Sequence, residues 1–159
     1  MPIEHTIGDY KMETEKLVLT GRVNYKLFDE AGKLKDERDV KNVVVTVGKN
    51  YLALWLTQAT QSDYFMRYLA LGTGSTAASA SDTILETELA TRVAGTLSSS
   101  TNVWQNQGTF GPGVNTGAIT EAGIFTASSA GTMLARQVFS VINKAAGDSL
   151  QVTWQITLS

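Results

Sequence analysis

The most informative part of this chain consists of GPGVNTGAITEAGIF, at residues 111–125, and TMLARQVF, at residues 132–139. It opens with turn-forming residues, because proline sets φ and glycine adopts backbone conformations that are closed to other residues. Short apolar segments follow, and their length and composition are typical of β-strands. Almost none of the side chains belongs to the types that carry out catalysis. The stretch therefore predicts a structural scaffold.

Alternating apolar residues continue this pattern on both sides. Residues 17–27 alternate along one face, a polar turn follows at 29–33, and a return segment ends at 42–47, which together predict a β-hairpin. The last strand is the clearest in the chain, because its apolar residues alternate strictly with Gln and Thr. These apolar residues are Leu150, Val152, Trp154, Ile156 and Leu158. We expect Trp154 to lie in the core.

Between the hairpin and the last strand we expect one helix and several strands. Gly48, Lys49 and Asn50 are expected to end a strand, and residues 51–59 have helical spacing of apolar residues, with Trp55 on the packed face. Strands are expected at about residues 64–71, 91–99, 101–110, 118–126 and 132–142. In the first of these, Phe65, Tyr68 and Ala70 compete for the inner face.

The expected fold is mainly β, an antiparallel β-sandwich or partly open barrel with one packed helix. A chain of 159 residues fits one domain with a sizeable core. We expect residues 16–159 to form that single β-rich domain. Residues 1–15 show little apolar periodicity, and they predict an extended N-terminal arm.

Composition excludes several classes of function. The net charge of −2 and the pI near 5.4 argue against a nucleic-acid partner, which a basic stripe would bind. The chain has no cysteine, which removes disulfides, thiolate catalysis and cysteine-ligated metal sites. No apolar run approaches the roughly 20 residues of a membrane-spanning helix, and the first residues lack the pattern of a secretory signal. A soluble protein without a membrane partner is expected.

Charge is unevenly distributed along the chain. Of the 28 charged residues, 18 lie at positions 1–50 and 10 in the remainder, which is rich in Ser, Thr, Ala and Gly. Interface cores are depleted in charge, so such a surface can pack against a neighbouring protein without burying many ions. A plain β-domain with a polar surface is the alternative interpretation, and the composition leaves both open.

The acidic residues of the β-rich part favour ion pairing over catalysis. A glycosidase needs two facing carboxylates of tuned acidity, whereas Glu86, Glu88 and Glu121 show no such arrangement in the sequence. Glu121 is expected to pair with Arg92 or Arg136, because the planar guanidinium can bind a carboxylate through two hydrogen bonds. Such a pair would hold strands or subunits in register.

The remaining candidates also indicate contacts rather than chemistry. His5 is the sole histidine and has no acid–base partner at a suitable spacing, so no catalytic residue, cofactor or metal site is expected. The segment 72–76 (GTGST) resembles a phosphate loop only superficially, since it lacks the Gly-Lys-Ser/Thr ending. Trp104 is surrounded by polar residues and is a candidate for ligand or subunit contact.

The loop at 111–113 is a second candidate for an interaction. Gly111, Pro112 and Gly113 form either a projecting contact loop at a symmetry axis or a wide connection between strands. The sequence weighs these two interpretations about equally.

Several of these pieces together resemble a pattern found in virion proteins of tailed bacteriophages. The pieces are GTGST at 72–76, LETEL at 85–89 with Arg92, GAITEAGIF at 117–125, LARQVF at 134–139, and the last alternating strand. The resemblance covers roughly residues 68–158.

This resemblance implies a structural protein of the virion, assembled in the cytoplasm of the bacterial host. Within that class it favours a capsid decoration (cement) protein, a homotrimer that clamps neighbouring copies of the major capsid protein. A tail component (fibre, adaptor or baseplate-associated protein), with host-surface binding as a further role, is the alternative, because the same pieces occur in tail proteins.

Overall fold

The computed structural model describes residues 16–55 and 66–159. The elements are β1 (Leu19–Phe28), β2 (Leu34–Val44), α1 (Thr46–Trp55), β3 (Tyr68–Gly72), β4 (Val93–Ala94), β5 (Thr96–Ser100), β6 (Val103–Phe110), β7 (Gly117–Phe125), β8 (Met133–Lys144) and β9 (Ser149–Leu158). The N-terminal arm expected at 1–15 lies outside the described residues.

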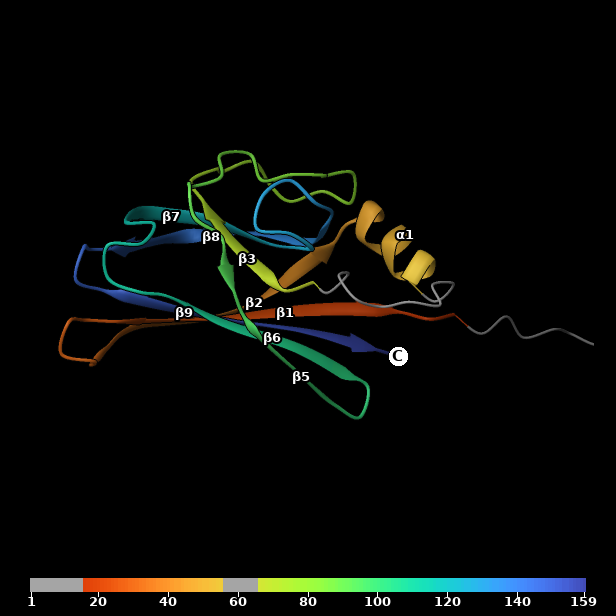
Figure 1. The fold of residues 1–159 in the computed structure, drawn as a ribbon, viewed down its shortest axis with the longest axis horizontal. Coiled ribbons are helices and arrows are strands. Elements are labelled where there is room, and N and C mark those ends of the chain that lie inside the picture. The colour runs from red at the N-terminus through yellow and green to blue at the C-terminus, as the bar shows by residue number, and fades with distance from the viewer. Residues whose placement is uncertain (1–15, 56–65) are drawn as a thin grey trace, which may run out of the picture.

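All nine strands belong to one antiparallel sheet with the order β4-β3-β7-β8-β2-β1-β9-β6-β5. The sheet curls into two facing layers that share β2, as Figure 1 shows. The mainly β, antiparallel fold with one helix confirms the fold class expected from the sequence. Strand β9 lies between β1 and β6 and pairs with both over nearly its full length, so the last alternating segment forms the middle of one layer.

Two corners let the sheet curve into a nearly closed barrel. Strand β2 pairs with β1 from Leu34 to Asn42, but it pairs with β8 only at Val43 and Val44, so it passes from one layer to the other. The opposite corner lies between β4 and β5, the two ends of the sheet, which Gly95 alone separates in the sequence. The chain therefore crosses from one end of the sheet to the other through a single residue.

Asn106 of β6 fastens the corner at Gly95. Its side chain is fully buried, and its Nδ2 donates hydrogen bonds to the carbonyls of Met66 (3.0 Å) and Arg67 (2.9 Å). The N–H of Gly95 donates to the same Arg67 carbonyl at 2.9 Å. A Cβ added to Gly95 would lie 1.7 Å from Asn106 Oδ1, so this corner has no room for a larger residue.

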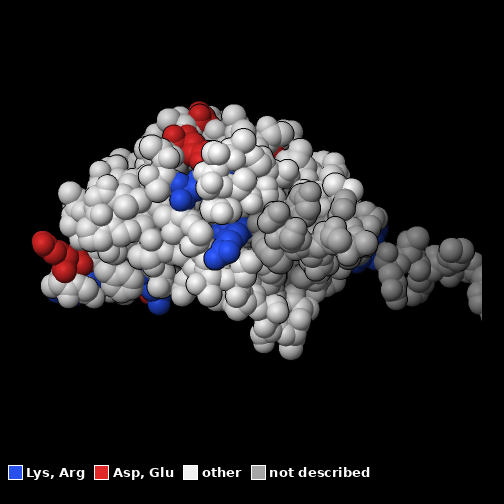
Figure 2. Space-filling view, viewed as in Figure 1, with Lys and Arg blue, Asp and Glu red and all other residues white. Residues whose placement is uncertain are grey.

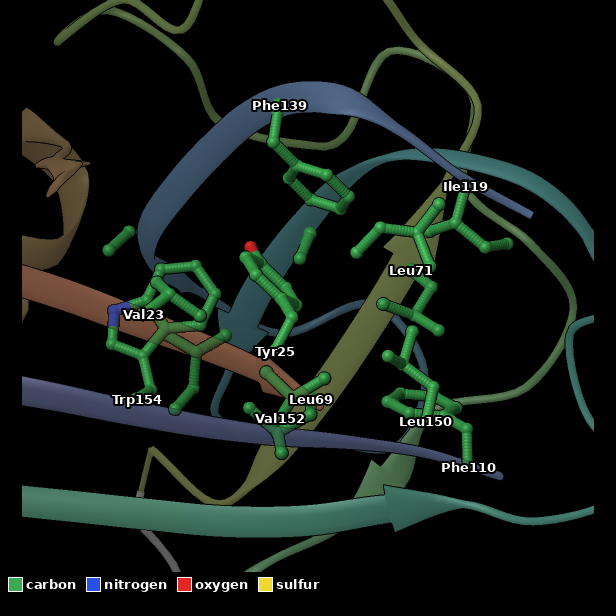
Figure 3. Close-up of a cluster of buried hydrophobic side chains, with 14 of the residues drawn as sticks. Val23, Tyr25, Leu69, Leu71, Phe110, Ile119, Phe139, Leu150, Val152 and Trp154 are labelled. Atoms are coloured by element: carbon green, nitrogen blue, oxygen red, sulfur yellow. The ribbon is translucent and has the colours of Figure 1, made fainter. Parts of the chain in front are cut away.

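Apolar side chains from both layers fill the barrel. Trp154 and Val152 of β9 are fully buried, as the alternation predicts, and Figure 3 shows them beside Val23, Tyr25 and Leu69. The ring of Tyr25 lies 4.3 Å from that of Phe139, centroid to centroid. Full burial of side chains of this size stabilises a fold by about 1.5–3 kcal/mol each, so this interior is the main source of stability.

A second apolar cluster lies outside the barrel, under the loop of residues 73–92. Its members are Val45, Ala70, Leu85, Phe125 and Met133. Figure 1 shows this loop passing over the outer side of the layer formed by β3, β7 and β8. That layer is therefore apolar on both faces, with the barrel interior on one side and the loop on the other.

This double burial corrects one expectation. Leu69 and Leu71 of β3 face the barrel interior, whereas Ala70 lies in the second cluster and Tyr68 packs against it. The expected inner face of Tyr68 and Ala70 is wrong, because a strand that is buried on both sides carries apolar residues at every position. Phe65, the third candidate, lies outside the described residues.

The helix also begins earlier than the sequence predicts. Residues 48–50, expected to break a strand, lie within α1, which packs beside β8 at one end of the barrel (Figure 1). A Cβ on Gly48 would lie 2.6 Å from the Cα of Leu134, so this glycine lets the helix approach β8 closely. The part of the predicted helix after Trp55 lies outside the described residues, and so does the side chain of Trp55.

Replacing Gly95 tests the closing corner. Gly95→Ala should lower the free energy of unfolding by about 2–4 kcal/mol, because the methyl group overpacks the corner and displaces the buried hydrogen bonds of Asn106. Urea unfolding followed by tryptophan fluorescence measures the change. Gly111→Ala is the matched control, since its Cβ would meet nothing within 4 Å, and it should change stability by less than about 0.5 kcal/mol. Equal effects of the two substitutions would contradict this account of the corner.

Candidate functional site

Glu121 is the centre of the densest polar network in the described residues. It lies on β7 and its side chain is fully buried beneath the 73–92 loop. Oε1 accepts hydrogen bonds from the N–H groups of Gly74 (3.0 Å) and Thr87 (2.7 Å). Oε2 accepts from the N–H of Glu86 (3.1 Å) and from Nε of Arg136 (3.0 Å). Charge-assisted bonds of this kind are about twice as strong as neutral ones, so one carboxylate fixes three points of the loop.

Arg136 of β8 completes this network from the neighbouring strand. Its guanidinium lies 2.8 Å from Glu121 Oε2, donates to Asp82 Oδ2 at 2.8 Å, and donates to the carbonyl of Thr76 at 3.1 Å. Burial disfavours the charged guanidinium, but the hydrogen bonds to Asp82 and Glu121 outweigh it and raise the pKa of Arg136. Of the two arginines that the sequence offered to Glu121, the structure selects this one.

Local features of β7 and of the loop place the Glu121 carboxylate. The register of β7 on β8 shifts between Ile119 and Glu121, so Ile119 faces the interior while Glu121 faces the loop. A Cβ on Gly72 or Gly74 would lie 2.4 Å or 2.6 Å from Glu121 Oε1. Both glycines of the GTG segment are therefore needed for the close approach of the carboxylate. The segment binds an anion after all, and that anion is a carboxylate of its own chain.

The other acids of the loop are also held by fixed donors. Glu86 accepts hydrogen bonds from the N–H (2.7 Å) and hydroxyl (2.8 Å) of Thr76, and these bonds lower the pKa of Glu86. For Asp82, burial raises the pKa, but the bonds from the Ser79 N–H and from Arg136 prevail and leave it lowered. The donors to these carboxylates are backbone and side-chain groups of the loop and of Arg136, so the two acids help to hold the loop in place.

Arg92 pairs with Glu88 rather than with Glu121. Its Nε and Nη2 lie 2.5 Å and 2.9 Å from the two carboxylate oxygens of Glu88. Nη1 donates to the carbonyls of Ala127 (2.9 Å) and Ala130 (2.7 Å), and the guanidinium lies 3.6 Å above the ring of Phe125. Arg92 thus ties the end of the 73–92 loop to the turn between β7 and β8.

The loop of Gly111, Pro112 and Gly113 joins β6 in one layer to β7 in the other. Lys144 is buried and donates from Nζ to the Gly111 carbonyl at 2.8 Å, while the Gly113 N–H donates to the carbonyl of Ala146 at 2.7 Å. Burial lowers the pKa of Lys144, although the charge of Asp148 partly opposes this. The loop is therefore anchored as an inter-layer connection, and its exposed Pro112 and Gly113 are the residues open to a partner.

Trp104 is half-buried at the end of the barrel where α1 lies. It lines an apolar cavity of about 440 Å³ together with Leu97, Leu134, Ile156 and Leu158. The sequence singled out this residue because its neighbours are polar. Side chains alternate between the two faces of β6. Gln105 therefore lies on the outer face, whereas Trp104 and Asn106 lie on the inner face, where Trp104 lines the cavity.

The outer face of the barrel layer that contains β9 is divided into a charged half and an uncharged half. On β1 and β2, Arg22 pairs with Asp39 and Lys26 with Glu37. On β9 and β6 the outward residues are uncharged: Val103, Gln105, Gln107, Thr109, Gln151, Thr153, Gln155 and Thr157. Two of the cross-strand pairs are hydrogen-bonded, since Nε2 of Gln155 and of Gln107 donate to Gln105 and Thr153 at 2.9 Å. The uneven distribution of charge along the sequence therefore appears in the fold as two halves of the same outer face, a charged half on β1 and β2 and an uncharged half on β9 and β6.

Lys144 and Asn106 are residues of these networks that the sequence did not single out, and the bonds of Asp82 and Thr76 to Arg136 were not expected. The spacing of Gly72 and Gly74 was the available signal for a close approach at the loop, although the sequence led us to weigh this segment only as a phosphate loop. Lys144 and Asn106 gave no signal, because these residue types are usually exposed.

In the part of the chain that the structure describes, no three His, Cys, Asp or Glu residues are grouped so that they could hold a metal ion. Within the same residues, no helix has the length and apolar character needed to cross a membrane. Comparisons with family models, curated proteins and solved structures find no match to this chain.

Removing the charge of Glu121 should destabilise the protein strongly. Glu121→Gln places an amide group against N–H donors and leaves Arg136 with one fewer carboxylate, at a cost of about 3–5 kcal/mol. Chemical denaturation measures this loss, and limited proteolysis within residues 73–92 reports release of the loop. Glu37→Gln, which breaks the solvent-exposed pair with Lys26, is the control and should cost less than about 1 kcal/mol. A Glu121→Gln protein as stable as the control would refute the central place given to this carboxylate.

Acid should loosen the same loop. The pKa of Asp82 is lowered in the folded protein, so its contribution to stability is present above the unfolded value and is lost as pH falls below about 4. Glu86 acts in the same direction. The urea concentration at the midpoint of unfolding, measured from about pH 7 downward, should decrease once the pH falls below about 4. Asp82→Asn should make this decrease smaller. An identical acid profile for the variant would contradict this role of Asp82.

Proposed function

We propose that this chain is a structural protein of a bacteriophage virion, and most specifically a capsid decoration (cement) protein. The observation that carries the proposal is the meeting of the sequence pieces on which the resemblance rests. GTGST, LETEL, GAITEAGIF and LARQVF are separate segments of the sequence, yet they contribute Gly74, Thr87, Glu121 and Arg136 to one network. The resemblance therefore concerns one physical unit of the fold.

The surface supports a role in assembly. The outward residues of β9 and β6 are amides, hydroxyls and a valine, which can pack against a neighbouring protein without leaving ions in a low-dielectric interface. Figure 2 shows that charged side chains are sparse on the face seen there. The proposed partners are the major capsid protein and further copies of this chain, arranged as a homotrimer at local symmetry axes of the shell.

The proposed mechanism is the clamping of neighbouring capsid proteins by accumulated contacts. Each contact between uncharged surfaces is modest, but repetition over the shell converts weak single contacts into high avidity. A barrel whose outer loop is fixed by buried hydrogen bonds suits this role, because a rigid surface loses little conformational entropy on binding. Pro112 and Gly113 are the exposed tip proposed to contact a neighbour.

A tail component is the second candidate, because the same sequence pieces occur in tail proteins. These 159 residues contain no fixed-period repeat of the kind that builds a fibre shaft, which favours the capsid for this domain. Half-buried Trp104 is the residue that would serve host-surface binding in a tail protein, and Trp104→Ala tests it by loss of glycan binding.

The number of copies per virion separates the two candidates. A decoration protein should be present at roughly hundreds of copies, since it repeats over the shell, and quantitative mass spectrometry of purified virions measures this. Roughly tens of copies or fewer would assign the chain to the tail. Its absence from virions would overturn the proposed function altogether.

A further inference from the structure

Strand β5 offers an unpaired edge. Within the described residues it is the last strand of the sheet on its side, with β6 as its single neighbour. A two-residue turn joins Ser100 to Val103, so hydrogen-bonded pairs with β6 fall at Thr96, Ser98 and Ser100. The N–H and C=O groups of Leu97 and Ser99 consequently point away from the sheet. They form a template for a further strand.

The part of β2 that pairs with β1 alone is also open on one side, but it is protected, and this contrast is informative. Along β2, where the pairing with β8 ends, Arg38 donates to the carbonyls of Ser140 (2.9 Å) and Val141 (3.2 Å) and pairs with Asp36 at 2.8 Å. Charged side chains on an edge strand oppose pairing with another chain. Strand β5 (TLSSS) carries no charge and no proline. Charged side chains thus protect the open stretch of β2, whereas β5 has no such protection.

An apolar cavity lies directly beneath the open edge. Leu97, Ser99 and Trp104 share the inward face of the β5–β6 hairpin and line the cavity of about 440 Å³. A strand added beside β5 would direct every second side chain to this same face. Backbone hydrogen bonds combined with a side-chain pocket are the features by which sheet edges bind extended peptides. The occupant should therefore be an extended segment with apolar residues at some of the positions that face the cavity.

The first residues of the chain have this chemistry. A second hollow, lined by Lys16, Leu17 and Lys49, shares Leu19, Leu52 and Leu158 with the cavity, so the described chain begins at the lip of one continuous groove. Residues 1–15 contain four acidic residues and one lysine, which complements the two lysines of the groove. Ile3 and Ile7 are four residues apart and share one face of an extended strand.

We propose that residues 1–15 of a neighbouring copy add as a strand to the β5 edge, with isoleucine side chains in the cavity and acidic residues near Lys16 and Lys49. The contact joins different surfaces of the two copies, so successive contacts form a ring where the rotation between copies closes and an open chain of copies where it does not. This inference rests on the self-association part of the proposed function and names its mode.

Cysteine cross-linking tests the pairing in the full chain, which has no cysteine of its own. Ile7→Cys and Leu97→Cys proteins are mixed and oxidised, and the mixture should yield a disulfide between the two variants. Ile7→Cys mixed with Thr153→Cys is the control, because Thr153 lies on the outer face of β9 and should give none. Ser99→Pro removes an outward N–H and should abolish the cross-link, whereas Ser99→Ala should retain it; circular dichroism verifies that each variant is folded.

Any of three results in the mixing experiment would overturn the inference: no cross-link between Ile7→Cys and Leu97→Cys, equal cross-linking to Thr153→Cys, or a cross-link that survives in folded Ser99→Pro. In the double variant Ile7→Cys/Leu97→Cys, a disulfide formed within single molecules would assign the groove to the chain's own segment and exclude the neighbouring copy. If the protein is present in virions but the cross-link does not form, this inference is wrong and the proposed function stands. If the cross-link forms but the protein is absent from virions, the proposed function is wrong and this inference stands.

Discussion

The buried carboxylate of Glu121 is the interaction on which the outer half of this structure depends. A charge removed from water must be compensated by hydrogen bonds or an opposite charge, and Glu121 obtains both, from three N–H groups of the 73–92 loop and from Arg136. This requirement holds an irregular segment on the barrel. Leu85 of that loop then covers the second apolar cluster, so an electrostatic constraint also determines where apolar surface is buried.

Glycine makes both critical contacts of the fold possible. Gly72 and Gly74 allow the carboxylate to reach the backbone of the loop, and Gly95 allows Asn106 to reach across the closing corner. In each case a Cβ would lie within 3 Å of a side chain that is fixed by its own hydrogen bonds. None of these three glycines has a positive φ, so they are needed for space rather than for backbone freedom.

Much of the strand content could be predicted, and the failures have physical causes. The hairpin of β1 and β2 and the inward face of β9 followed from alternation, because one face of each strand meets the core and the other meets solvent. Alternation failed for β3, which is buried on both faces. It also failed at Gly48, where close packing of a helix on β8 resembles a strand break. Glu121 was expected to pair with one of two arginines, and only the neighbouring β8 decided between them.

Local sequence patterns are enough to specify the β-rich architecture, the hairpin, the last strand, and the uneven distribution of charge. These are properties of short segments, since alternation and turn residues act within a few positions. The tertiary structure alone decided the near-closure of the barrel at Gly95, the network around Glu121, and the apolar groove beneath an open strand edge. Each of these joins residues far apart in the sequence, and strand order and register, which local patterns do not encode, bring them together.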